Sequence, residues 1–241
     1  MLEIKDLHKS YGEKQILKGI NCTLDNGVYG LLGPNGAGKS TLMNIITTNL
    51  KADSGAVLWN GKNIEDDSDA YRADLGYMPQ QQGLYQGFTG MMFLNYIATL
   101  KEVTKEDMKK SIEEVVKAVN LQTDIHRKIK TYSGGMKQRL LIASAMIAHP
   151  KLILFDEPTA GLDPKERIRV KNMLMQLAKD KIIIVATHIV PDIENIAKEV
   201  LVLKDGVLLA EKSPEGLIRE YAPSGNLEDV YMKIFADGEQ I

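Results

Sequence analysis

An eight-residue glycine-rich loop constrains this chain more than any other stretch. Residues 33–40 have the sequence Gly-Pro-Asn-Gly-Ala-Gly-Lys-Ser. The apolar run 28–32 before the loop predicts a strand. The apolar residues after the loop recur at helical spacing, as Leu42, Ile45, Ile46 and Leu50. Strand, loop and helix in this order predict a phosphate-binding loop on an α/β core.

The residue types of this loop suit a nucleotide and a metal ion. Glycines let successive N–H groups turn inward on the phosphates, and Lys39 adds a positive charge at the β and γ phosphates. The Ser40 hydroxyl can ligate Mg²⁺. The predicted nucleotide-binding residues here are Gly33, Pro34, Asn35, Gly36, Ala37, Gly38, Lys39, Ser40 and Thr41.

Composition excludes several other classes of protein. The 241 residues are 44% hydrophobic and 26% charged, which is ordinary for a globular chain with a full core. A net charge of −2 does not suggest a general nucleic-acid binder, and the single cysteine, Cys22, excludes an internal disulfide. No stretch approaches the roughly 18 apolar residues of a membrane span, and the start lacks the apolar segment of a signal peptide. We therefore expect a soluble, cytosolic protein whose membrane role would come from a partner.

The order of elements predicts a mostly parallel sheet covered by helices on both faces, with an antiparallel β edge. Further strands are expected over residues 2–7, 55–59, 75–78, 152–155, 182–186 and 200–203. Helices are expected from Pro164 and Pro191, and over 227–235. Residues 83–131 show helical spacing instead, and Thr104 with Asp107 resembles a capping box. We expect an α/β core of residues 1–82 and 133–212, a helical subdomain of 83–132, and a short polar tail of 213–241.

A second candidate site follows an apolar strand. Residues 152–157 end in Asp156 and Glu157, and acids at the carboxyl end of a buried parallel strand should face a ligand crevice. Phosphoryl transfer needs a carboxylate for the metal and a group that orients water. We assign Asp156 to Mg²⁺, through its water shell, and Glu157 to the role of general base. His188 follows strand 182–186 and Thr187, so we expect it at the same edge.

An octet of residues 132–139 opens a strongly apolar helix. Its sequence is Tyr-Ser-Gly-Gly-Met-Lys-Gln-Arg, and the apolar part of the helix is expected over 140–148. Ser133 can cap this helix, and a helix start offers free N–H groups to an anion. Taken alone, these residues also fit an ordinary capped core helix.

The order of phosphate loop, octet and Asp-Glu pair resembles the ATP-binding cassette (ABC) ATPases over about residues 2–212. The resemblance implies the ABC ATPase fold on a P-loop NTPase core, with ATP and Mg²⁺ as cofactors. It also implies a pair of subunits in which Ser133, Gly134 and Gly135 of one close over ATP held by the other. Tyr132 and Met136 replace the leucine and glutamine that are usual in this family.

Four further roles are implied by the resemblance. Tyr11 is placed like the aromatic residue that stacks on adenine, and Gln80 like the glutamine that contacts Mg²⁺ or the attacking water. His188 corresponds to the switch histidine that contacts the γ-phosphate. Asp163 ends the sequence Ala-Gly-Leu-Asp, which matches the loop that crosses the dimer axis, and it should also cap the helix from Pro164.

The resemblance implies the ATP-hydrolysing subunit of an ABC transporter. Its expected partners are a second ATP-binding subunit, identical or different, and transmembrane permease subunits. The sequence looks most like bacterial drug- and ion-type exporter cassettes, which favours export. We expect the protein to be cytoplasmic and peripheral at the inner face of the cell membrane. Residues 83–90 are the expected docking surface, and no nucleic acid is expected as a partner. Three alternatives remain: a non-transport ABC ATPase acting with nucleic acid or ribosomes, a small-molecule kinase, and an ATP-gated sensor or scaffold.

Overall fold

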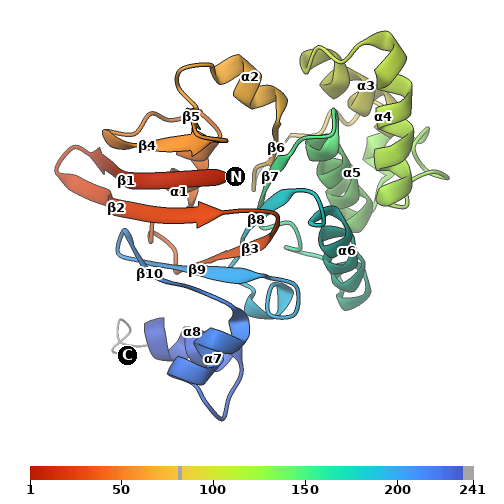
Figure 1. Cartoon of the computed structure of the whole chain (residues 1–241). Helices are drawn as coiled ribbons and strands as arrows, with labels where there is room; N and C mark the ends of the chain where they lie inside the picture. Colours follow the sequence, from red (N-terminus) through yellow and green to blue (C-terminus); the bar gives the residue numbers. More distant parts are fainter. Residues whose placement is uncertain (81–82, 236–241) are drawn as a thin grey trace.

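Two β-sheets carry the fold in the computed structural model, which describes residues 1–80 and 83–235 (Figure 1). The four-stranded sheet is antiparallel, and its strands, in the order β2-β1-β4-β5, are β2 (Lys14–Leu24), β1 (Leu2–Tyr11), β4 (Ser54–Trp59) and β5 (Lys62–Asn63). The six-stranded sheet has the order β10 (Val207–Lys212), β9 (Glu199–Lys204), β3 (Gly27–Leu32), β8 (Ile182–Ala186), β7 (Leu152–Asp156) and β6 (Leu75–Met78). Neighbouring strands of this sheet pair in parallel except at its end, where β10 pairs with β9 in the antiparallel sense.

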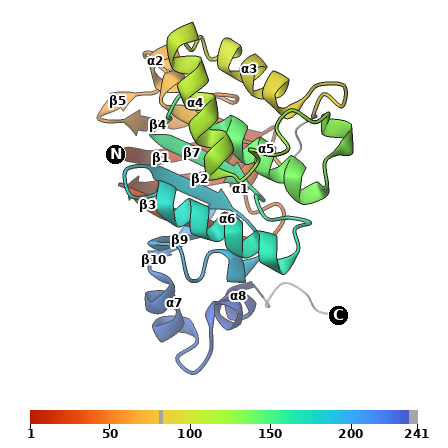
Figure 2. The same cartoon turned by 90° about the vertical axis from the view of Figure 1, so that its right-hand side faces the viewer.

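Eight helices and two short 3₁₀ turns lie around these sheets in the described residues. The helices are α1 (Lys39–Ile46), α2 (Ser68–Ala73), α3 (Gly90–Leu100), α4 (Lys105–Ala118), α5 (Gly134–Met146), α6 (Pro164–Leu177), α7 (Pro214–Tyr221) and α8 (Leu227–Phe235), with short 3₁₀ turns η1 (Ile129–Thr131) and η2 (Val190–Asp192). Helices α3 and α4 lie beside α5, whereas α7 and α8 lie near β9 and β10 (Figures 1 and 2). None of the helices in the described ranges is long and apolar enough to cross a membrane.

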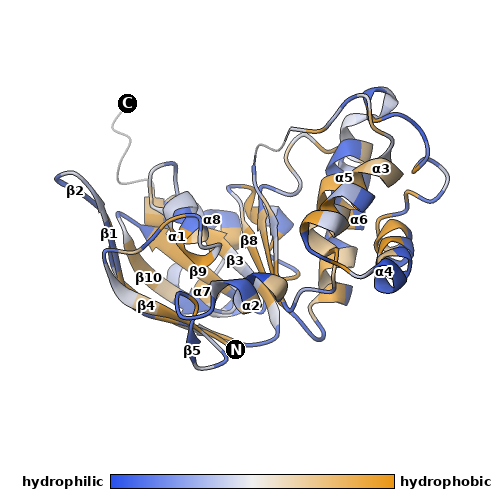
Figure 3. Ribbon diagram, turned by 90° about the horizontal axis from the view of Figure 1, so that it is seen from above, coloured by the Kyte–Doolittle hydropathy of each residue, from blue (hydrophilic) through white to orange (hydrophobic). Residues whose placement is uncertain are grey.

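Alternation along the parallel strands builds two hydrophobic cores. In β7, Ile153 and Phe155 pack into the core that contains α5 and α6, whereas Leu152 and Leu154 pack into the core that contains α1 and the antiparallel sheet. The apolar residues of β3, β8 and β9 stand out in Figure 3. Because a parallel strand must be buried on both faces, its sequence is a continuous apolar run. The predicted α/β fold is therefore confirmed.

The predicted helix starts are confirmed at their caps. Thr104 accepts a hydrogen bond from the Asp107 backbone at 3.2 Å, and Asp163 accepts one from the Glu166 backbone at 3.0 Å. Each cap satisfies an N–H group that the first turn leaves without an intrahelical partner.

The predicted helix from Pro191 is wrong. Only the 3₁₀ turn η2 forms, and irregular turns follow it. Ile193 is fully buried beneath Gly30, where a Cβ would come within 2.3 Å of the Ile193 Cδ1 atom. Lys198 already donates its backbone N–H to Val28 of β3, at 2.7 Å. Tertiary packing thus returns the chain to the sheet before a helix can form. The helix expected to run through Ala148 also ends early, at Met146, because Ile147 has a ψ of 140°, outside the helical range, and Ala148 follows with a φ of 69°.

The chain after Ser213 is more structured than predicted. Besides the expected helix 227–235, it forms α7, which Ser213 caps by accepting from the Gly216 backbone at 3.1 Å. Leu217 and Leu227 are fully buried against the larger core. The sequence pattern did not predict this packing because both helices are short. Residues 236–241 of the predicted tail, and residues 81–82 of the predicted core, lie outside the described residues.

Candidate functional site

Three neighbouring strands bring the predicted phosphate and carboxylate residues to one edge of the six-stranded sheet. The strands β3, β8 and β7 lie side by side and run parallel. The phosphate loop follows β3, His188 follows β8 by two residues, and Asp156 and Glu157 mark the end of β7. The carboxyl ends of these strands therefore meet where the fold offers a ligand crevice.

The phosphate loop leaves the start of α1 open to an anion. Gly38 occupies the N-cap position with a φ of 109°, a left-handed conformation that favours glycine. Since glycine has no side chain, no cap covers the first N–H groups of α1. A Cβ at Gly33 would come within 2.4 Å of the Leu203 carbonyl oxygen, so the loop also packs against β9 through a glycine. This cradle fits a phosphate group.

Lys39 lies between the loop carbonyls and the two carboxylates. Its ammonium group donates to the carbonyl oxygens of Gly33 and Pro34, at 2.5 and 3.1 Å. Burial lowers the pKa of Lys39, and the charges of Glu157 and Asp156 oppose that shift. The charges of Lys39, Asp156 and Glu157 are therefore close enough to influence one another.

The carboxyl group of Asp156 is partly buried at the same edge. Burial raises its pKa, the neighbouring charge of Glu157 raises it further, and Lys39 opposes both. A divalent cation would offset the cost of charge at this position, and Mg²⁺ is usually held by one or two carboxylates together with phosphates and water. Asp156 and the exposed Ser40 hydroxyl therefore fit such an ion. Within the described ranges, no group of three or more His, Cys, Asp or Glu side chains gathers around a metal position.

Glu157 is held tightly by the loop after β8. One carboxylate oxygen accepts from the Thr187 hydroxyl at 3.1 Å. The other accepts from the His188 backbone N–H at 3.1 Å and lies 2.7 Å from Nδ1 of that histidine. Glu157 has a φ of 53°, a strained backbone conformation for a non-glycine residue, and it is only 7% exposed. By contrast, the His188 side chain is 62% exposed.

Gln80 and Tyr11, the other two residues predicted for this site, are both exposed. Gln80 is exposed two residues after β6, which pairs with β7 as far as Met78 opposite Phe155. Tyr11 ends β1, opposite Lys14, and its ring is 53% exposed. A Cβ at Gly38 would lie 2.9 Å from Leu17 of β2, so the β1–β2 hairpin approaches the phosphate loop.

The octet lies on the surface at the start of α5. Ser133 caps the helix by accepting from the Met136 backbone at 3.2 Å, and Ser133 and Gly134 are exposed. Tyr132 is buried, and its hydroxyl donates to the Asp124 carbonyl at 2.8 Å. Among residues 1–80 and 83–235, no hydrogen bond or ion pair joins 133–135 to the phosphate loop. Asp163 is likewise exposed, at the start of α6.

Four residues that hold the Glu157 loop were not predicted as site residues. Gln138 donates its side-chain amide to the carbonyl oxygens of Glu157 and Pro158, at 3.3 and 2.8 Å. The Thr159 hydroxyl donates to the carboxylate of Asp192, and both residues are buried. Thr187 holds the Glu157 carboxylate itself. These contacts join residues far apart in the sequence, and no local pattern signals them.

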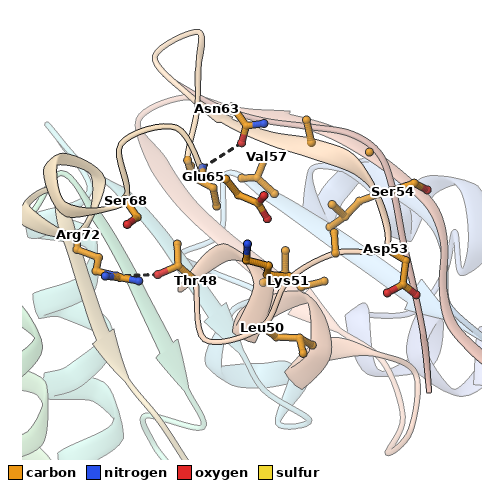
Figure 4. Close-up of a pocket in the computed structure, with 16 residues that line it drawn as sticks. Thr48, Leu50, Lys51, Asp53, Ser54, Val57, Asn63, Glu65, Ser68 and Arg72 are labelled. Atoms are coloured by element: carbon orange, nitrogen blue, oxygen red, sulfur yellow. Dashed lines mark hydrogen bonds between the residues drawn. The ribbon is translucent and has the colours of Figure 1, made fainter. Parts of the chain in front are cut away.

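A separate cavity of about 350 Å³ lies between β4 and the end of α1 (Figure 4). None of the predicted site residues lines it. Two hydrogen bonds join polar groups of its lining: the Arg72 Nε donates to the Thr48 hydroxyl at 2.9 Å, and the Glu65 backbone donates to Asn63 at 3.1 Å (Figure 4). The cavity is therefore not a candidate for the phosphate chemistry.

The chain is similar to known proteins in sequence. A family model described as ABC transporter matches residues 17–160. The chain is 37% identical over 219 residues to YdbJ, an uncharacterised ABC transporter ATP-binding protein of Bacillus subtilis (strain 168), covering 90% of this chain and 70% of the relative. It is 34% identical over 222 residues to the Nod factor export ATP-binding protein I of Rhizobium sp. (strain N33), covering 91% and 73%.

A solved structure extends the likeness to the fold. It is a dimeric ATP-binding cassette in a post-hydrolysis state, bound to ADP and Pi. Its TM-score with this chain is 0.78 at 29% identity, and the match covers 88% of this chain and 98% of the other.

Proposed function

The chain belongs to the ABC transporter family as an ATP-binding subunit, and from that premise we propose that it powers export through separate membrane-spanning chains. Members of this family bind and hydrolyse ATP. One relative is named for the export of Nod factor, which supports export as the direction. The membrane-spanning chains would bind the solute.

The observation that carries hydrolysis is geometric: the parallel strands β3, β8 and β7 lie side by side, so the phosphate loop, Asp156 and Glu157 come to one sheet edge. We assign Lys39 and the loop N–H groups to the β and γ phosphates, and Glu157 to the attacking water as general base. Asp156 and Ser40 would hold Mg²⁺, and Gln80 would contact the metal or the water. When bound, Mg²⁺ would neutralise part of the phosphate charge.

His188 and Glu157 form a pair with divided tasks. Because Nδ1 of His188 faces Glu157, Nε2 is the ring nitrogen directed to the γ-phosphate in this proposal. The Thr187 hydroxyl and the His188 backbone keep the carboxylate oriented. Tyr11 would stack on adenine from the β1–β2 hairpin, because it is exposed and the same hairpin contacts Gly38 of the phosphate loop through Leu17.

Ser133, Gly134 and Gly135 would complete the site of a second subunit. They form an exposed helix start that lies outside the chain's own phosphate site, and a similar cassette is known as a dimer. The N–H groups and dipole of α5 would face the γ-phosphate held by the partner. Asp163, at the exposed start of α6, would lie at the same interface.

The helical segment of residues 83–132 is our proposed link to the membrane-spanning chains, inserted between core residues 1–82 and 133–212 and followed by the tail 213–241. Tyr85 packs on Phe88 and Tyr96, with ring centroids 4.9 and 5.6 Å away. Tyr85 and Met92 are each 50% exposed. Large apolar side chains exposed together mark an interaction surface. Docking there would hold the protein at the cytoplasmic face of the membrane.

Purification of the chain from membranes, with identification of the associated proteins, tests this proposal. We expect membrane-spanning chains to co-purify, and expect Tyr85→Ser with Met92→Ser to release them while ATP binding persists. Ile168→Ser with Met175→Ser is the matched control, because these α6 residues are 58% and 42% exposed on another surface. Recovery of ribosomes or nucleic acid in place of membrane proteins would contradict transport.

A further inference from the structure

Gln138 of α5, the helix that begins at the octet, holds the loop that carries Glu157. Gln138 donates its amide N–H groups to the carbonyl oxygens of Glu157 and Pro158, at 3.3 and 2.8 Å. Carbonyl oxygens only accept, so the NH₂ end of Gln138 must face them. We propose that Gln138 is a positioning residue that couples the two ATP sites of the dimer, an inference that rests on the proposed function.

The backbone at Glu157 needs such support. Its φ of 53° is sparsely populated by non-glycine residues, and it persists only where the surroundings fix it. The Glu157 N–H donates to the Ala186 carbonyl at 2.8 Å, and the carboxylate is fixed by Thr187 and His188. On the carbonyl side, Glu157 accepts from the Ala160 backbone N–H at 3.2 Å and from Gln138, which also holds the Pro158 carbonyl. Loss of the Gln138 amide would loosen the loop at both carbonyls and let the carboxylate leave the position from which it aligns water.

Gln138 also belongs to the helix that begins at the octet serine. Ser133 caps α5, and Gln138 lies in the second turn of the same helix. Arg139, the next residue, bonds the carbonyls of Val119 and Asn120 at 3.0 and 2.7 Å and pairs with Glu166 of α6 at 3.2 Å. The start of α5 is therefore a rigid unit, and a displacement at Ser133 moves Gln138 with it.

These two contacts serve different ATP molecules. In the proposed dimer, Ser133 meets the γ-phosphate held by the partner, whereas Gln138 meets the Glu157 that acts on this subunit's own ATP. Occupation of one site thereby aligns the base of the other, because both contacts lie on one helix. Hydrolysis should depend cooperatively on ATP, and Gln138 should carry the coupling.

The variant Gln138→Glu isolates this contact. It keeps the shape of the side chain but replaces the donor by a carboxylate facing two carbonyl oxygens. We expect the kcat for phosphate release to fall about 10-fold or more, because both hydrogen bonds of Gln138 to the loop are lost, with KM for ATP nearly unchanged. The Hill coefficient for ATP should fall to about 1, the value for independent sites. Gln138→Met, which removes the donor without adding charge, should behave alike if the charged variant folds poorly.

Gln176→Glu is the matched control, because it places the same charge on the exposed face of α6. Its kcat and Hill coefficient should equal those of the unchanged chain. Unchanged kcat and cooperativity in both Gln138 variants would overturn the coupling role while leaving the proposed function intact. So would a Hill coefficient of about 1 in the unchanged chain. An unchanged chain that releases no phosphate would overturn the proposed function itself, and this inference with it.

Discussion

The phosphate loop and the octet use the same local device for different purposes. Each places glycines at the start of a helix, α1 in one case and α5 in the other. At α1 the cap is Gly38, and Lys39 bonds to the loop's own carbonyls. The charges of Glu157 and Asp156 act on the pKa of Lys39. At α5 the cap is Ser133, which is exposed and bonds only locally, to the Met136 backbone.

In our proposal, this difference separates a site that one chain assembles from a surface that a second subunit completes. The α1 start faces the carboxyl ends of three strands, so its partners come from the same fold. The α5 start faces outward, and its N–H groups can serve only a ligand that approaches from outside. Glycine-rich helix starts are therefore ambiguous in isolation, and the surrounding strands decide their role.

Glu157→Gln should have the largest effect on turnover. It tests the site that the chain assembles from its own residues. The change removes the base but keeps the shape and the hydrogen-bonding reach toward Thr187 and His188. We expect phosphate release to fall about 10²–10⁴-fold, the usual contribution of a general base, with ATP binding retained. Steady-state phosphate release with a parallel nucleotide titration measures both quantities.

Asp180→Asn is a control for the loss of one negative charge, because Asp180 is exposed beyond the end of α6. It should leave turnover unchanged. Near-normal turnover in Glu157→Gln would remove Glu157 from the role of base and would make the carboxylate at the end of β7 a structural anchor.

Ser133→Arg should have the next largest effect, on the surface that needs a partner. A bulky cation at the exposed start of α5 would block the approach of a second subunit. In the Glu157→Gln background, which preserves bound ATP, we expect ATP-dependent dimerisation to weaken at least about 30-fold, as for an interface hot spot. Binding of ATP to the single subunit should persist, because the phosphate loop is untouched. Light scattering with ATP and with ADP measures the dimer.

Lys39→Ala gives the contrasting result that this comparison requires. It should abolish ATP binding to the single subunit, and dimerisation with it, because the charge on the phosphates is lost. If Ser133→Arg still dimerised with ATP, the octet would be no more than a capped helix start. If it lost ATP binding to the single subunit as well, the two regions would not be separable.

The sequence predicted the first region more completely than the second. The loop 33–40 and the pair Asp156-Glu157 act through local patterns, a fixed spacing and a strand end, so their convergence followed from the rule for parallel strands. The bonds of Gln138 and Asp192 join segments about 20 and 33 residues apart, and no periodicity predicts them. Tertiary context also replaced the helix expected from Pro191, because Ile193 had to fill the space beneath Gly30.

The tail shows the same limit of prediction from sequence, because tertiary packing decides its structure. Ser213 and Pro214 form a helix start of the kind that identified Asp163 and Pro164, yet α7 was not predicted. An eight-residue helix offers too few apolar repeats to distinguish it from a polar linker. Its stability comes from Leu217 in the core, which only the folded chain reveals.

The smallest expected effect is a change in stability at Lys101, which lies where the end of α5 meets β6. Lys101 caps α3, and its ammonium group donates to the carbonyls of Leu75, at the start of β6, and Ile147, at the end of α5, at 2.9 and 3.1 Å. Burial lowers its pKa from 10.5 to about 8. The far end of the octet helix is thus joined to the phosphate-binding core through a partly desolvated cation.

Removal of this cation should change how stability depends on pH. Between pH 8 and 10.5 the unfolded state holds more protons at Lys101 than the folded state, so the contribution of Lys101 to stability rises with pH across that window. Below about pH 8 both states are protonated, and the full burial cost of the charge persists. The free energy of unfolding of the unchanged chain, minus that of Lys101→Met, should therefore be flat up to about pH 8 and then increase. Chemical denaturation over this range measures it, and Lys105→Met, at an exposed lysine, should show no such slope. A difference that falls with rising pH would mean that the two carbonyls stabilise the charged form of Lys101. The ammonium group would then stabilise the fold where α5 meets β6, rather than destabilise it through the burial of its charge.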